Sequence, residues 1–196
     1  MIAKPNIIII HGTTGCPEEN WYPWLKEEVH ALGWDASVPT FPTPEGQSLG
    51  TWKAAFNKQL GSVRPNMILI GHSIGTAFIL NLLEESAEPV TATYMVAGFI
   101  GKLGLEEFDG LNESFTCRQF RWKKIRENLG CGRIFHADND PYVPLAKACE
   151  LSEKLNVPIT MMRGAKHINE AAGYKTFPLI LEQLKLDLSN KTAARS

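Results

Sequence analysis

Short apolar runs alternate with longer segments of helical periodicity along almost the whole chain. The run "NIIII" at residues 6–10 is rich in β-branched side chains and contains no polar alternation, and "MILI" at 67–70 resembles it. Such runs are typical of parallel strands that helices cover on both faces. Further runs of this kind occupy residues 34–41, 90–99, 132–137 and 157–164. We therefore expect an α/β fold with a mainly parallel, doubly wound, six-stranded sheet and right-handed crossovers.

The segments between these runs place apolar residues at helical spacing. In the first segment Leu25, Val29 and Leu32 recur at this spacing, and Gly33 stands where a helix would end. The stretch from Gly101 to Asn128 is less regular, and one helix is predicted near its end. The predicted helices occupy residues 21–33, 51–63, 73–87, 120–130, 144–155 and 176–189.

Length and composition favour one ordinary globular domain. A chain of 196 residues is long enough to bury about 70% of the surface that its unfolded form exposes. Apolar residues make up 44% and charged residues 21%, which is far from the composition of disordered chains. We expect a single domain over residues 1–189, followed by a polar tail at 190–196 that frays.

Charge and hydropathy argue against nucleic-acid and membrane partners. The net charge of −1 gives no basic surface that would neutralise phosphates. The longest apolar run, Ile7 to Ile10, is far shorter than the roughly 20 residues that span a bilayer. The first 30 residues have no signal-peptide pattern. None of the four cysteines has C-x-x-C spacing, so we expect free thiols and a cytoplasmic location; they are Cys16, Cys117, Cys131 and Cys149.

The sequence "GHSIG" at residues 71–75 joins a predicted strand to a predicted helix. G-x-S-x-G in this setting is typical of a nucleophile elbow, in which glycines flank a strained serine and the next amide faces an oxyanion. Ser73 is therefore the candidate nucleophile. A tight turn that needs only small residues is the alternative interpretation.

Two aspartates follow the fifth predicted strand. Because ligand sites in open parallel sheets lie beyond the carboxyl ends of the strands, either could reach Ser73. Asp140 stands in "DPYVP", a pattern that resembles the acid loop of many α/β-hydrolases. Asp138 could instead stabilise its own loop by bonding the backbone. Asp140 is the preferred acid, and Asp138 the alternative.

Five histidines compete for the position of general base. Only His167 follows the last predicted strand, where a loop can bring an imidazole over Ser73. The others are expected elsewhere: beside the loop after the first strand, on a helix face, in the elbow and at a strand end; they are His11, His30, His72 and His136. The resulting chain order of Ser, Asp and His is that of the α/β-hydrolases.

The loop "HGTTG" at residues 11–15 is expected to approach the substrate closely. The amides of Thr13 and Ile74 are the candidate oxyanion donors, with Thr14 as a near alternative. The loop matches neither common phosphate-binding glycine motif, so no nucleotide is expected. No His, Cys, Asp or Glu cluster has metal-ligand spacing, so neither cofactor nor metal is predicted.

Several segments together resemble one group within this superfamily. The sequences "HGTTG", "IGHSIG", "FTCRQFRWKKI", "DNDPYVP" and "KHINEAAGYKTFP" are similar to those of the small serine hydrolases related to retinoblastoma-binding protein 9 and the bacterial YdeN proteins. The resemblance runs from about Ile7 to Leu184. It implies a compact α/β-hydrolase with six parallel strands, no large lid domain, and a triad that maps onto Ser73, Asp140 and His167.

The names of this family derive partly from protein binding. The L-x-C-x-E motif that binds pocket proteins is absent, since its nearest match, from Leu129 through Cys131 to Arg133, ends in arginine. Protein binding of that type is therefore not expected.

Other residues carry weaker signals. Three tryptophans are expected mainly to pack in the core, although two of them follow the Thr13 segment and could wall a site; the three are Trp21, Trp24 and Trp52. Phe120 and Trp122 lie where a lid stands in this fold, and the sequence leaves open whether they face a substrate. Lys123, Lys124 and Arg126 are interpreted as a solvated face.

Taken together, these features predict a metal-free serine hydrolase that acts on small esters or related acyl compounds through an acyl-enzyme. Two alternatives stay open. The same three residues could cleave amides or peptides, and a hydrolase scaffold could serve as a protein-interaction module.

Overall fold

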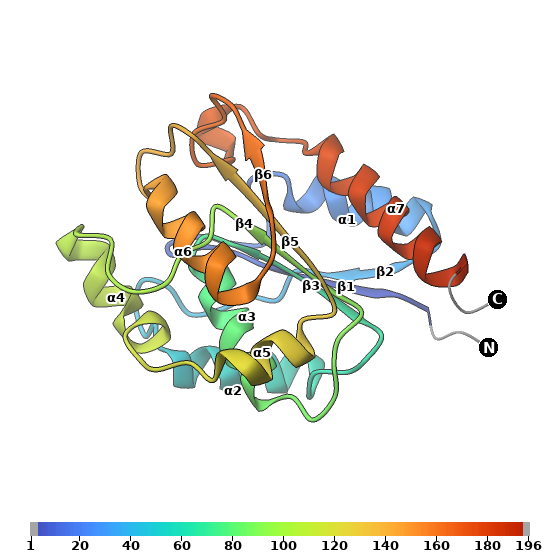
Figure 1. Cartoon of the computed structure of the whole chain (residues 1–196), viewed down its shortest axis with the longest axis horizontal. Coiled ribbons are helices and arrows are strands. Elements are labelled where there is room, and N and C mark those ends of the chain that lie inside the picture. Colours follow the sequence, from blue (N-terminus) through green and yellow to red (C-terminus); the bar gives the residue numbers. More distant parts are fainter. Residues whose placement is uncertain (1–3, 194–196) are drawn as a thin grey trace.

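All six apolar runs form strands of one parallel sheet in the computed structural model, which describes residues 4–193 (Figure 1). The strand order is β2-β1-β3-β4-β5-β6, so the chain reverses its direction of travel across the sheet between β1 and β3. Ligands bind at such switch points in open α/β sheets. The strands are β1 Asn6–Ile10, β2 Asp35–Ser37, β3 Met67–His72, β4 Ala92–Val96, β5 Cys131–Ala137 and β6 Ile159–Met162.

Helices cover both faces of this sheet, and the central strands β3 and β4 are buried along their whole length. Helices α1 and α7 lie on one face, and α2, α3 and α5 lie on the other (Figure 1). The helices are α1 Tyr22–Ala31, α2 Leu49–Leu60, α3 Ile74–Glu85, α4 Glu106–Thr116, α5 Trp122–Asn128, α6 Leu145–Leu155 and α7 Pro178–Ala193, with a 3₁₀ turn at Glu170–Ala172.

Aromatic side chains anchor the two packed layers. Trp21 and Tyr22 are fully buried beneath α1, and Trp52 and Phe56 are fully buried beneath α2. Trp24 is partly buried against the first of these layers. The packing predicted for the tryptophans is therefore present, and it ties the helices to the strands whose ends carry the candidate site.

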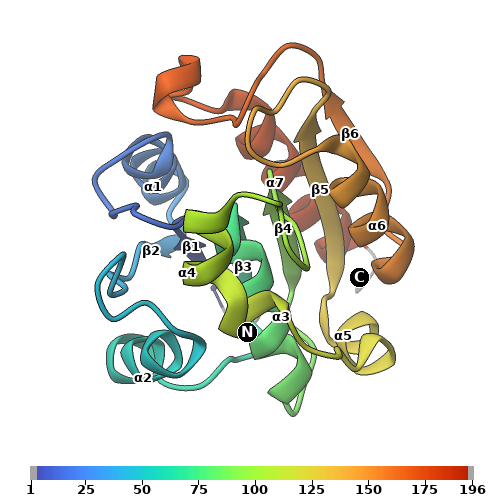
Figure 2. The same cartoon turned by 90° about the vertical axis from the view of Figure 1, so that its left-hand side faces the viewer.

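Helix α4 was not predicted from the sequence. Its residues "EEFDGLNESFT" include Gly, Asn and Ser, which are poor helix formers, and few apolar side chains. The acidic side chains of its first turn, Glu106, Glu107 and Asp109, favour the helix N-terminus. Phe115 buries its other end against the core. Figure 2 looks onto the carboxyl ends of the strands and shows α4 lying in front of β1 and β3.

The segment after α4 is tied to α3 by a buried carboxylate. The side chain of Glu84 is 1% exposed and lies 2.6 Å from the guanidinium of Arg118. Arg121 also pairs with Glu84, at 3.5 Å. A buried charge is costly without such partners, so these contacts fix where the segment crosses α3.

Two boundaries differ from the predicted ones. Strand β2 covers only three residues of the predicted 34–41 segment, because Pro39 and Pro42 lack the N–H groups that a longer ladder needs. Helix α7 continues to Ala193, past the start of the predicted tail at 190, and residues 194–196 of that tail lie outside the described part of the chain.

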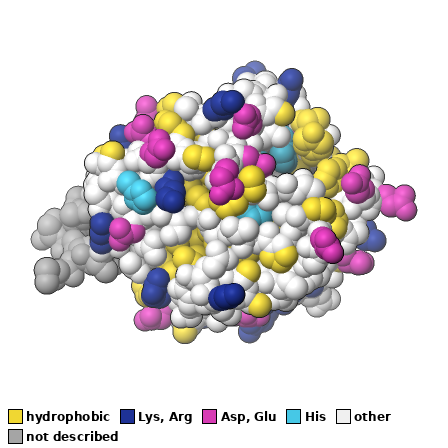
Figure 3. Space-filling view, turned by 180° about the vertical axis from the view of Figure 1, so that it is seen from behind, with side chains coloured by type: hydrophobic (Ala, Val, Ile, Leu, Met, Phe, Trp, Pro, Cys, Tyr) yellow, Lys and Arg dark blue, Asp and Glu magenta, His cyan; other side chains and the backbone are white. Residues whose placement is uncertain are grey.

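Charged side chains of both signs are interspersed on the face that Figure 3 shows, in line with the net charge of −1. Within residues 4–193 no helix has both the length and the apolar character needed to cross a membrane.

Candidate active site

Ser73 stands at a strained turn between β3 and α3. Its backbone has φ 54° and ψ −123°, a conformation that L-residues rarely adopt. The flanking glycines are required by space, because a Cβ on Gly71 would lie 2.6 Å from the amide of Thr76, and one on Gly75 would lie 2.4 Å from the carbonyl oxygen of Ile10. The glycines let the elbow press against β1, and the strained turn presents Ser73 beyond the end of β3.

His167 and Asp140 are joined by a hydrogen bond of 2.8 Å between Nδ1 and Oδ2. The side chain of Asp140 is 1% exposed, and its other oxygen accepts the amides of Tyr142 and Val143. Burial alone would raise the pKa of the Asp140 carboxyl, but the bond and charge of His167 and these two amides outweigh burial and lower that pKa. Asp140 is therefore ionised and its partner imidazole is held in one orientation.

The alternative acid, Asp138, makes a different contact. Its carboxylate accepts the amide of Gly164 at 2.8 Å, and the side chain of Asn139 accepts the amide of Lys166 at 2.9 Å. Both bonds reach the loop that carries His167, residues 163–169, which we call the His167 loop. Asp138 thus contacts the backbone of this loop, and Asp140 contacts the imidazole.

Side chains from α1 and the elbow hold the other side of the His167 loop. The Nε2 atom of His72 donates to the carbonyl of His167 at 2.9 Å, and Trp21 donates to the carbonyl of Ile168 at 3.0 Å. Because a carbonyl only accepts, Nε2 of His72 carries the proton, and its Nδ1 accepts from the hydroxyl of Tyr22 at 2.8 Å. Burial and the neighbouring His167 lower the pKa of His72 to about 3.

The remaining histidines bond to the backbone. His11 contacts the carbonyl of Gly12, His30 accepts the amide of Ala36, and His136 contacts the carbonyl of Val143. Burial lowers the pKa values of His11 and His136. Neither they nor His30 bonds a carboxylate within residues 4–193, so they lack the pairing that His167 has.

The loop of residues 11–15, which we call the Thr13 loop, passes beside Ser73. The amide of Thr14 donates to the hydroxyl of Thr43 at 2.7 Å and is therefore occupied. The amides of Thr13 and Ile74 have no acceptor in the described residues, and Ile74 opens α3, where the first amides have no partner within the helix. Thr13 and Ile74 thus have free donors near Ser73, and Thr14 does not.

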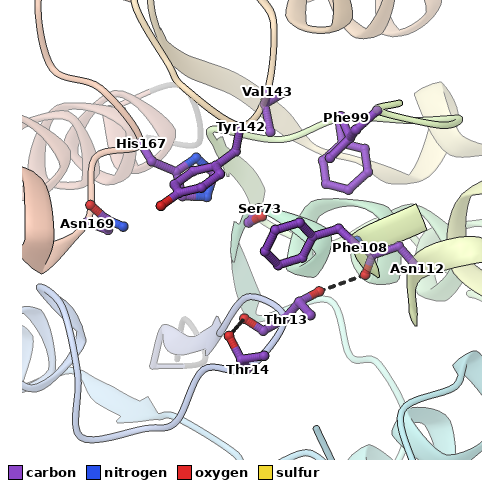
Figure 4. Close-up of a pocket in the computed structure, with 11 residues that line it drawn as sticks. Thr13, Thr14, Ser73, Phe99, Phe108, Asn112, Tyr142, Val143, His167 and Asn169 are labelled. Carbon is purple, nitrogen blue, oxygen red and sulfur yellow. Dashed lines mark hydrogen bonds between the residues drawn. The ribbon is translucent and has the colours of Figure 1, made fainter. Parts of the chain in front are cut away.

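Ser73, Thr13 and His167 line one cavity of about 160 Å³, which Figure 4 shows. Its far wall is largely apolar and consists of Phe99, Leu103, Phe108 and Val143, with Asn112 beside them. A second hollow of about 280 Å³ shares Ser73, Thr13 and His167 and continues toward the polar side chains of Glu19, Asn20, Asn169 and Glu170. The serine therefore lies between a cavity with an apolar far wall and a second, polar hollow.

Phe120 and Trp122, whose place the sequence left open, lie elsewhere. They line a separate hollow together with Arg118 and Lys154, and neither lines the cavity at Ser73. Helix α5, which begins at Trp122, packs beside α6 and α3.

Within the described residues no cluster of His, Cys, Asp and Glu could hold a metal ion. The four cysteines are exposed and form no disulfide. The groups that the structure brings together at this site are the serine, the imidazole, the carboxylate and the free amides.

Sequence reasoning did not find the residues that α4 and the loop before α2 contribute, chiefly Phe108, Asn112 and Gln47. The one available signal was the position of α4 between β4 and β5, where insertions in this fold stand over the site. That signal indicates which segment lies near the site, but it does not identify any of the residues that line it.

The chain is similar to known proteins over nearly its whole length. It is 24% identical to the putative hydrolase YdeN of Bacillus subtilis over 95% of this chain and 97% of that protein, and 22% identical to the serine hydrolase RBBP9 of Rattus norvegicus over 94% and 98%. The crystal structure of the B. subtilis ydeN product superimposes with a TM-score of 0.87, covering 95% of this chain and 100% of that one.

Esterase structures share the fold as well. Est1E from Butyrivibrio proteoclasticus superimposes with a TM-score of 0.69 at 19% identity, covering 97% of this chain and 89% of that one. The family model described as serine hydrolase matches residues 7–186. The predicted α/β-hydrolase fold and family are thus confirmed, and the chain belongs to the serine hydrolase family.

Proposed function

We propose that this hydrolase is a carboxylesterase that cleaves small acyl esters through an acyl-enzyme. Ser73 is the nucleophile, His167 the general base, and Asp140 the acid that orients His167. The amides of Thr13 and Ile74 stabilise the oxyanion. A small-molecule acyl ester is the substrate class that fits this site.

One observation carries the proposal. The imidazole that is bonded to a buried carboxylate lines the same cavity as the serine of the strained elbow. Because Asp140 accepts the Nδ1 proton, the Nε2 atom of His167 is left as the acceptor for the serine proton. The structure has no hydrogen bond between Ser73 and His167 among its described residues, and such bonds often form only when substrate is bound.

The reaction then proceeds in two halves. Ser73 Oγ attacks the ester carbonyl while His167 takes its proton, and the carbonyl oxygen becomes the oxyanion. Collapse of this intermediate breaks the bond to the alcohol, which leaves with the proton from His167. In the second half a water gives its proton to His167 and attacks the acyl-enzyme, and the imidazole returns that proton to Ser73 as the acid is released.

The test is labelling with a fluorophosphonate together with turnover of a p-nitrophenyl ester. Ser73→Ala should fold normally, lose labelling, and lose on the order of 10⁴–10⁶ of kcat, because triad members act as a unit. Retention of more than a tenth of the activity would refute the assignment of Ser73.

Two outcomes would favour the alternatives. Labelling of Ser73 with faster turnover of a matched p-nitroanilide than of the ester would indicate an amidase or peptidase. A folded wild-type protein that neither labels nor turns over any acyl compound would indicate an interaction module.

We also place the enzyme in the cytoplasm. Four exposed free thiols support this location, since a reducing compartment keeps them from pairing. Localisation of the tagged full-length chain is the direct check.

A further inference from the structure

Asn112 of α4 is a nearly buried amide at the wall of the cavity. Its exposed fraction is 3%, yet it lines the same cavity as Ser73 and His167. Its neighbours on that wall are apolar, chiefly Phe99, Leu103 and Phe108. A buried amide among apolar side chains calls for an account of each of its polar atoms.

A chain of hydrogen bonds fixes the orientation of this amide. The hydroxyl of Thr43 accepts the amide of Thr14 at 2.7 Å and donates to Oε1 of Gln47. The other end of the Gln47 amide lies 3.2 Å from the carbonyl oxygen of Leu111 and is therefore the nitrogen, because a carbonyl only accepts. This Nε2 atom also donates to Oδ1 of Asn112 at 2.9 Å. Donors and acceptors alternate along the chain in a single direction.

A second donor reaches the same oxygen. The hydroxyl of Thr13 donates to Oδ1 of Asn112 at 2.7 Å, which Figure 4 shows as a dashed line. Two donors therefore point at one side of the Asn112 amide, and that side must be the oxygen. The Nδ2 atom lies on the other side and keeps both of its protons for other acceptors.

Nδ2 of Asn112 has no acceptor among residues 4–193, and it is not among the polar atoms sealed off from solvent. The residue is 3% exposed and lines the cavity, so an acceptor for this donor can reach it from there. An unused donor there is satisfied only by water or by a substrate atom.

We propose that Asn112 is a specificity-determining residue, whose Nδ2 donates to an oxygen on the acyl part of the substrate while its Oδ1 positions the Thr13 loop. The preferred substrate is then an ester of a short, mostly apolar acid that carries one further oxygen acceptor, such as an ether or a hydroxyl. This inference rests on the proposed esterase function. A site with an unpaired buried donor discriminates against the analogue that lacks the acceptor.

The experiment compares three p-nitrophenyl esters of similar size: the butyrate, the methoxyacetate and the 3-hydroxybutyrate. The readout is the ratio of kcat/KM for each oxygenated ester to kcat/KM for the butyrate. Dividing the wild-type ratio by the ratio in a variant cancels the intrinsic reactivity of the esters, because this reactivity is the same for every enzyme.

Two variants of Asn112 remove the donor. Asn112→Leu removes both polar atoms, and Asn112→Asp keeps an oxygen for Thr13 and Gln47 while replacing the Nδ2 donor. We expect the ratio for at least one oxygenated ester to fall about three- to tenfold in both variants, the effect of one neutral hydrogen bond. If Asn112→Leu does not fold, the kcat/KM ratios of Asn112→Asp alone decide the test.

Thr13→Val is the matched control, because it removes the bond to Asn112 and leaves the Nδ2 donor in place. It should lower kcat for all three esters and leave the ratios unchanged. Ratios within twofold of wild type in a folded Asn112 variant would overturn the inference while the esterase function stands. Failure of the wild-type enzyme to turn over any of the three esters would refute the proposed function, and this inference with it.

Discussion

The two loops that meet at Ser73 are held in place by different chemistry. The His167 loop is held by two buried side chains of the core, His72 and Trp21, which donate to its carbonyls. The exposed strand-end residues Asp138 and Asn139 accept two of its amides. The Thr13 loop is fixed by partly buried, uncharged side chains, among them Gln47.

The contacts of the two loops have different consequences for the site. A buried donor left without its acceptor costs about 1–3 kcal/mol, so the bonds from His72 and Trp21 keep the His167 loop in place whether or not a substrate is present. The bonds of the Thr13 loop lead to α4, whose side chains line the cavity. The candidate base is thus positioned mainly by the core, and the candidate oxyanion donor Thr13 by contacts to α4, which lines the cavity.

The largest effect should come from the acid on the His167 side. Asp140→Asn leaves the geometry similar but offers His167 the wrong partner, so kcat should fall on the order of 10⁴-fold. Asp138→Asn removes charge from a contact to the Gly164 amide and should cost less than about tenfold in kcat. The kcat of each variant is measured with the same activated ester, after the two variants are shown to have equal melting temperatures. A larger loss of kcat in Asp138→Asn than in Asp140→Asn would mean that Asp138 is the acid.

The next effect concerns His72. His72→Phe removes the donor to the His167 carbonyl, and the resulting shift of the imidazole should lower kcat about 10- to 100-fold with little change in KM. His72→Gln restores a donor and should recover most of kcat. The control is Tyr22→Phe, which removes the hydroxyl bonded to His72 and leaves the carbonyl bond. Equal kcat for the Phe and Gln variants at position 72 would contradict this positioning role.

The buried histidines should also make the fold sensitive to acid. The folded-state pKa of His72 is about 3, below the unfolded value of about 6.5, so the unfolded chain binds more protons between these two values. Stability is therefore complete above about pH 6.5 and falls as the pH drops toward 3, by up to about 1.4 kcal/mol per pH unit for this residue. Burial shifts His11 and His136 in the same direction.

Denaturant unfolding at pH 7.5, 6.0 and 5.0 measures this loss. In His72→Gln the decline of the unfolding free energy should be shallower than in the wild type, because one of the three histidines whose pKa burial lowers is gone. An identical decline in the two proteins would contradict the neutral, buried state assigned to His72. The bonds of the Thr13 loop to Thr43, Gln47 and Asn112 contain no titrating group, so they add nothing to this decline.

The smallest effect is expected on the Thr13 side. Gln47→Met breaks the bonds to Thr13 and Asn112, and should lower kcat about three- to tenfold with a parallel loss of affinity for a boronic acid that mimics the tetrahedral intermediate. Gln59→Met is a matched control. Gln59 bonds the backbone of Thr40 on the neighbouring loop and has no hydrogen bond to Thr13 or Asn112. Similar losses in the two variants would mean that Gln47 acts only through general stability.

The sheet and the candidates at its edge could be predicted because their signals are local. A run such as Ile7–Ile10 identifies a buried parallel strand, and "GHSIG" carries its own strained geometry. His167 could be singled out because it follows the last strand. These arguments needed only the order of strands along the chain.

The cavity wall could not be predicted, because it depends on contacts between distant segments. Asn112 meets Thr13 across 99 positions in the sequence, and Gln47 meets Asn112 across 65. The choice of Thr13 over Thr14 as the candidate oxyanion donor likewise depends on Thr43, because its hydroxyl accepts the amide of Thr14. No periodicity or spacing carries such information.

Helix α4 belongs to the crossover between β4 and β5, and its far end is fastened to α3 through Glu84 and Arg118. Ser73, Asp140 and His167 all arise from other parts of the chain. Residues 101–117 contain no strand and no part of the elbow, although Phe115 packs in the core from within them. Substitutions at Leu103, Phe108 and Asn112 would therefore reshape the cavity wall while the strands and the elbow keep their own contacts.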